Sequence, residues 1–86
     1  MHARSLGRDI ASINNPSTQN AYSWHKRTEA LISEINRASD HAEISAWEFS
    51  RLYNRATAVR HGLLVLAVFG DVSALHIAGL RLETAC

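Results

Sequence analysis

The segment Gly62-Leu63-Leu64-Val65-Leu66-Ala67-Val68-Phe69-Gly70 contains nine consecutive residues without a polar side chain. Such a run has no side that favours water, so apolar material must cover it on every side. A chain of 86 residues has little interior for this purpose, because small domains bury a smaller share of their surface than large ones do. The run is therefore either the central element of a very small domain or is partly covered by a partner.

The residues before this run carry the strongest local signal, a helix start at Ser45. Ser45-Ala46-Trp47-Glu48 has the spacing of a capping box, in which the Ser45 hydroxyl accepts from the Glu48 amide and the Glu48 carboxylate accepts from the Ser45 amide. We expect one long helix from Ala46 to about Phe69. Its apolar positions recur at helical spacing, namely Phe49, Leu52, Tyr53, Ala56, Val59, Leu63, Leu66, Ala67 and Phe69.

Two further helices are expected around the long one. Residues 21–38 place Trp24, Leu31 and Ile35 on one stripe, which predicts an amphipathic helix with a single buried face. Gly70-Asp71 ends the long helix, because glycine suits the left-handed position after a helix and Asp71 or Ser73 can cap the next one. A short third helix then continues to about Glu83.

The C-terminal residues also fit a β-hairpin. Segments 64–69 and 72–77 flank the two-residue turn Gly70-Asp71, and their valines and phenylalanine favour strands. Periodicity does not separate a buried helix from a buried strand over so short a run. The cap at Ser45 and the unbroken spacing through Val59 favour the helix. We predict an all-α fold, a small bundle of two longer helices plus a short C-terminal helix, with α+β and a C-terminal β-hairpin as the alternative.

The predicted organisation is an N-terminal arm over residues 1–20 and a single helical domain over 21–86. Leu6, Ile10 and Ile13 in the arm lie at i, i+4 and i+7, which predicts a short amphipathic turn or two that docks loosely. The polar segment 14–20 contains the only proline and breaks this turn. The predicted core is Trp24, Leu31, Ile35, Phe49, Leu52, Tyr53, Ala56, Val59, Leu63, Leu66, Leu75, Ala78 and Leu82.

Composition limits the environment and the partners. Nine Lys and Arg face eight Asp and Glu, so net charge alone does not indicate nucleic acid. With Cys86 as its one cysteine the chain forms no internal disulfide, and we expect a cytoplasmic protein. The apolar run is shorter than the roughly 20 residues that span a membrane, and extending it brings in Arg60 and Asp71.

Polar residues form no constellation that predicts catalysis. His25 and Glu29 have the i, i+4 spacing of two metal ligands, and His61 and His76 lie on the two sides of the Gly70 turn, but neither pair has further ligands at a recognisable spacing. Segment 40–43 carries an aspartate, a histidine and a glutamate without a neighbouring nucleophile, and the glycines form no phosphate loop. We therefore predict no enzyme, no metal and no cofactor.

The functional prediction follows from the mismatch between the apolar run and the small interior. We expect a small non-enzymatic helical interaction module, a regulator or adaptor, that binds a partner protein or a second copy as a homodimer. Its partner-binding residues are predicted to be Leu64, Val65, Val68, Phe69, Ile77 and Leu80. The alternative is a small DNA-associated transcription regulator that binds phosphate through an arginine stripe on the polar side of the long helix, formed by Arg51, Arg55 and Arg60.

Overall fold

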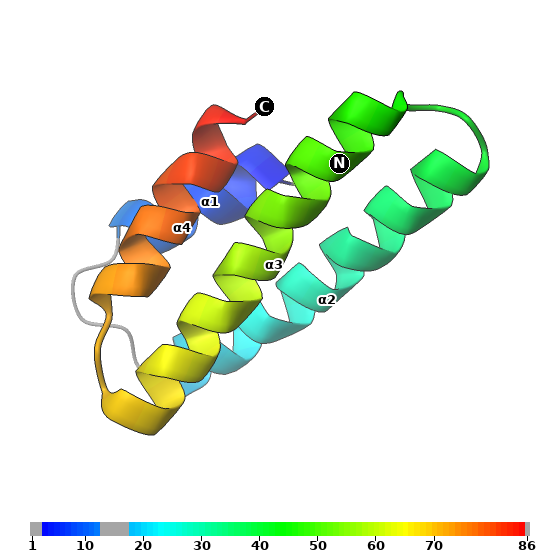
Figure 1. Ribbon diagram of the computed structural model, residues 1–86. Coiled ribbons are helices and arrows are strands. Elements are labelled where there is room, and N and C mark those ends of the chain that lie inside the picture. Colours follow the sequence, from blue (N-terminus) through cyan, green and yellow to red (C-terminus); the bar gives the residue numbers. More distant parts are fainter. Residues whose placement is uncertain (1–2, 13–17, 86) are drawn as a thin grey trace.

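The computed structural model describes residues 3–12 and 18–85, and these form four α-helices and no strand. The helices are α1 (Ala3–Ser12), α2 (Thr18–Asp40), α3 (Ala46–Phe69) and α4 (Ser73–Thr84). Consecutive helices run antiparallel, α3 lies between α2 and α4, and α1 packs mainly on α4 (Figure 1). This confirms the predicted all-α bundle. The β-hairpin alternative is not supported, because residues 64–69 belong to α3 and 73–77 to α4.

The long helix α3 begins and ends where the sequence predicts. The Glu48 amide donates to the Ser45 hydroxyl over 3.1 Å, and the Ser45 amide donates to the Glu48 carboxylate over 3.4 Å, so both bonds of the capping box are present. At the other end Gly70 has φ 69°, and its amide donates to the Leu66 carbonyl over 2.9 Å. A residue with a Cβ avoids this left-handed conformation, which explains a glycine at this position.

Replacing Ser45 by alanine should destabilise the fold by about 1 kcal/mol, because the Glu48 amide at the start of α3 loses the hydroxyl that caps it. Urea denaturation followed by circular dichroism measures this loss. Ser50→Ala is the matched control, since Ser50 is exposed on the same helix and alanine is the better helix former. Equal stability of Ser45→Ala and Ser50→Ala would contradict a role for the box.

The start of α4 depends on Asp71. The residue in the N-cap position, Val72, has no side chain that can cap, and the Asp71 carboxylate instead accepts from the Ser73 amide over 2.9 Å. This backbone hydrogen bond, together with one from the Ser73 side chain, lowers the pKa of Asp71 below its ordinary value near 3.8. The predicted cap from Asp71 is therefore present, although it comes from outside the formal cap position.

The lowered pKa of Asp71 predicts a pH-dependent contribution to stability. Because the folded-state pKa lies below the unfolded one, the contribution is present above the unfolded value and is lost as the pH falls through the folded value. Asp71→Ala should therefore lower the urea midpoint at about pH 7 and make much less difference at about pH 2. A difference from wild type that is the same at both pH values would contradict this role.

The observed core contains most of the predicted positions and adds a contribution from α1. Of the predicted core residues, Phe49, Tyr53 and Leu66 are only partly buried and pack against the core, and the others are buried. The segment expected to dock loosely is helix α1, whose Leu6 and Ile10 are fully buried. Ile13, which we expected on the same stripe, lies outside the described residues. The N-terminal helix is thus part of the core.

The backbone of α4 approaches the backbones of α1 and α3 closely, because glycines lie at both contacts. A Cβ built on Gly7 of α1 would lie 2.5 Å from the Glu83 amide nitrogen and from the Gly79 carbonyl oxygen of α4. A Cβ on Gly79 would lie 2.7 Å from a methyl carbon of Ile10. On the other side, a Cβ on Gly62 of α3 would lie 2.8 Å from the Leu75 Cα. The backbone of α4 is therefore held between two helices with no room for additional side-chain atoms.

Gly7→Ala should destabilise the fold by about 3 kcal/mol, because the added methyl group meets backbone atoms that cannot move independently. Alanine stabilises an isolated helix relative to glycine. A lower free energy of unfolding in urea would therefore come from the packing contact alone. Gly79→Ala should cost a similar amount, since its methyl group would lie 2.9 Å from the Cβ of the fully buried Ile10 and 3.1 Å from the Gly7 carbonyl oxygen. Gly70→Ala has open space around it and should cost about 1 kcal/mol through its positive φ. A Gly7→Ala variant as stable as wild type would contradict the close contact.

Candidate protein-interaction surface

The last two turns of α3 extend from the core into solvent. Gly62 and Leu63 are buried, whereas Leu64 and Val68 each expose more than half of their surface and Phe69 exposes 78%. The expectation that the whole run is buried is therefore wrong for its second half within a single chain.

The position of α4 explains this exposure. Leu75 already lies against Gly62, and α4 begins only two residues earlier, at Ser73. Because the two helices are antiparallel, the part of α3 that follows Gly62 extends past the close contact with α4 (Figure 1). The short connection through Gly70 and Asp71 leaves the outer side of these turns open to solvent.

The predicted partner-binding residues are therefore on the surface. Leu64, Val65, Val68 and Phe69 lie on consecutive turns of α3, with Val65 partly buried and the other three exposed. On α4, Ile77 and Leu80 are three residues apart and both are exposed. We call the whole predicted set the apolar end surface; it comprises Leu64, Val65, Val68 and Phe69 at the end of α3 and, further along the bundle on α4, Ile77 and Leu80.

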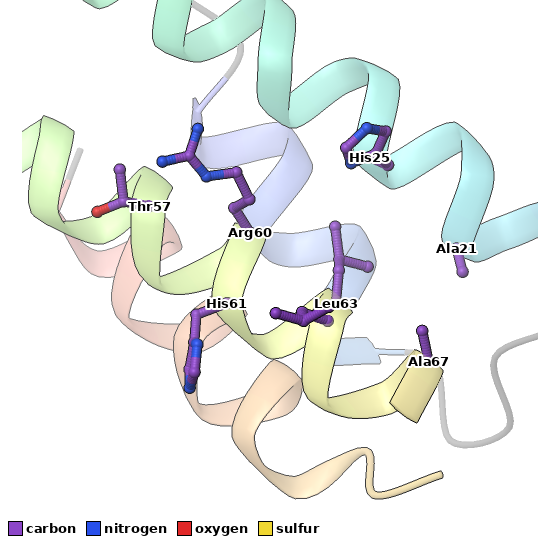
Figure 2. Close-up of a pocket in the computed structure, with 8 residues that line it drawn as sticks. Ala21, His25, Thr57, Arg60, His61, Leu63 and Ala67 are labelled. Carbon is purple, nitrogen blue, oxygen red and sulfur yellow. The ribbon is translucent and has the colours of Figure 1, made fainter. Parts of the chain in front are cut away.

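A groove of about 620 Å³ between α2 and α3 adjoins the apolar end surface through Leu64. Ala21, Leu63 and Ala67 also line it, and they make its floor mostly apolar. Figure 2 shows the side chains of His25 from α2 and Arg60 from α3 extending into the space between the two helices. The groove therefore continues the apolar surface and adds basic groups at one side.

Histidines in and near this groove do not form a recognisable metal site. His25 and His61 both line the groove, but Glu29, the expected partner of His25, contacts Arg60 at 3.7 Å instead. Within residues 3–12 and 18–85, no group of three or more His, Cys, Asp or Glu side chains is arranged to hold a metal ion. The groove offers apolar contact and hydrogen bonding.

The predicted arginine stripe does not lie on one side of α3. Arg60 faces α2, where it pairs with Glu29, whereas Arg51 lines a groove together with Thr84 and Ala85 at the end of α4. Nine residues at about 100° each separate Arg51 from Arg60 by half a turn of the helix. The stripe therefore reduces to Arg51 and Arg55, which are four residues apart.

Sequence reasoning assigned no role to Trp47, which is the most exposed tryptophan of the described chain. It exposes 69% of its surface, against 3% for Trp24. The guanidinium carbon of Arg51 lies 4.7 Å from the centre of the Trp47 ring. A signal for this exposure exists in the sequence, because Trp47 falls outside the apolar stripe that begins at Phe49.

Comparisons of this chain with protein-family models, with curated proteins and with solved structures found no match. Among the described helices, none combines the length and the apolar character that crossing a membrane requires.

Proposed function

We propose that this chain is a small non-enzymatic interaction module, a regulator or adaptor, that binds a partner protein through the apolar end surface and associates with itself. The observation that carries the proposal is the exposure of Leu64, Val68 and Phe69 on consecutive turns of one helix. Contiguous exposed apolar side chains cost free energy in water, and on soluble proteins they mark interaction sites.

The scarcity of charged residues around the apolar end surface supports a partner whose surface is also apolar. From His61 to Leu80, Asp71 is the only Asp, Glu, Lys or Arg in the sequence. An apolar surface without charges gives no electrostatic penalty when a second apolar surface covers it. A second copy of the chain presents such a surface, and two copies related by a twofold axis would cover each other.

We propose that the module acts in the cytoplasm. Its fold is held by helix packing around α4 and needs no disulfide, in agreement with the single cysteine in the sequence.

Replacing Val68 and Ile77 together by serine should reduce the assembled mass to that of a monomer without unfolding the chain. Both side chains are mostly exposed in the single chain, so we expect the free energy of unfolding at low protein concentration to change by less than about 0.5 kcal/mol. Sedimentation equilibrium measures the mass, and urea denaturation measures the stability.

The control is Arg51→Gln with Arg55→Gln, which changes a different part of α3 and should leave the mass unchanged. Wild-type protein that stays monomeric at its highest soluble concentration would refute self-association. A serine double variant that assembles like wild type would show that the apolar end surface is not the contact.

A further inference from the structure

Trp47, near the start of α3, presents an aromatic ring to solvent at a distance from the apolar end surface. Arg51 lies over one side of the ring at 4.7 Å from its centre, a distance at which a cation attracts an aromatic ring. Trp47 as a whole exposes 69% of its surface, so the side of the ring that Arg51 does not cover is open to solvent. An exposed tryptophan ring offers a large flat surface on which a ligand can stack.

Arg51 and Arg55 differ from the other arginines of the described chain. Arg8, Arg27 and Arg60 have acidic partners within 4 Å, and the remaining arginines are exposed to solvent. Arg51 and Arg55 are half-buried, and within the described residues neither forms an ion pair.

The Nε atoms of both arginines are shut off from solvent and have no hydrogen-bond partner within the described chain. Their terminal Nη groups are therefore the donors that remain for a ligand. Two like charges four residues apart on a helix also repel each other. An anion bound between Arg51 and Arg55 would relieve this repulsion.

These side chains line one groove of about 350 Å³. Besides Trp47 and the two arginines, Ser50 and Asn54 contribute a hydroxyl and an amide. The groove thus combines two cations, two hydrogen-bonding groups and a single aromatic ring. A protein interface usually has a core of several apolar side chains, which this groove lacks. A flexible polyanion with flat rings needs only cations and a surface for stacking.

No acidic side chain of the described chain forms an ion pair within 4 Å with Arg51 or Arg55. Glu48 lies between Trp47 and Arg51 in the chain, but its carboxylate accepts from the hydroxyl and the amide of Ser45 at the helix cap. Arg81 of α4 is a further exposed cation at a similar level along the bundle. Because Leu75 lies against Gly62 and the helices are antiparallel, the rise of 1.5 Å per residue brings Arg81 to about the level of Arg55.

We propose that Trp47, Arg51 and Arg55 form a binding site for single-stranded nucleic acid. The arginines contact phosphate groups, and a base stacks on the open side of Trp47. This site is separate from the apolar end surface and does not depend on the function proposed for that surface. It also replaces the stripe expected from the sequence, because Arg60 is not part of it.

Fluorescence anisotropy of a labelled oligothymidylate, titrated with the full-length chain at low salt, tests the site. We expect binding that weakens with salt, with a slope of about −1.4 in a plot of log K against log salt, since two phosphate contacts contribute about 0.7 each on a single strand. Binding should also change the fluorescence of Trp47, which is exposed, while Trp24 is buried and should report little.

Arg51→Gln with Arg55→Gln should abolish the salt-dependent part of binding, and Trp47→Leu should weaken binding about tenfold through the loss of stacking. Arg60→Gln is the matched control on the same helix, and its affinity should equal that of wild type. Circular dichroism confirms that each variant is folded, which the partial exposure of these residues permits.

Three results would overturn the proposal. The first is the absence of binding to the oligothymidylate at low salt. The second is an equal loss of affinity in Arg60→Gln and in the Arg51, Arg55 double variant, which would show a diffuse charge effect. The third is that polyglutamate displaces the oligothymidylate at equal charge concentration, which would assign the groove to an acidic protein segment.

Discussion

The structure depends on the close contact of α4 with α1 and α3. Glycine is a poor helix former, so Gly7, Gly62 and Gly79 each cost about 1 kcal/mol of helix propensity relative to alanine. In return the helix backbones approach to distances that a Cβ would prevent. Helix α1 has only ten residues, which is too short to be stable alone in water. Its helical state therefore depends on this contact, and the burial of Leu6 and Ile10 depends on it in turn.

The same contact fixes which part of α3 stays uncovered. Leu75 against Gly62 sets the position of α4 along α3, and α4 has half as many residues as α3. Moving α4 by one turn toward Gly70 would cover more of α3, but it would bring Leu75 to the level of Leu66, whose side chain prevents the close approach that Gly62 permits. The exposure of Phe69 and Val68 is therefore a consequence of tight packing elsewhere in the bundle.

The elements that the sequence predicts well are those that short-range chemistry determines. The Ser45-Glu48 capping box and Gly70 set the two ends of α3, and both act within a few residues. The docking of α1 could not be predicted in this way, because Gly7 and Gly79 are far apart in the chain and a glycine in a helix is locally only a weakness. The exposure of the candidate surface was predictable from local sequence as well. A helix that is apolar all round cannot be buried on every side in so thin a bundle. The error in the arginine stripe, in contrast, was avoidable from the helical angle between Arg51 and Arg60.

Three arginines form ion pairs that connect two helices, whereas Arg51 and Arg55 form none in the described chain. Arg8 pairs with Glu83 across α1 and α4, Arg27 with Asp9 across α1 and α2, and Arg60 with Glu29 across α2 and α3. Each pair is partly exposed and contributes at most about 1 kcal/mol, but each connects two helices. The pair at 2.8 Å joins α1 to α2, which contact each other less than the other adjacent helices do. At the boundary of α3 with α4 no such pair occurs in the described residues. Glycine packing holds that boundary instead, and Arg51 and Arg55 of α3 form no ion pair within the described chain.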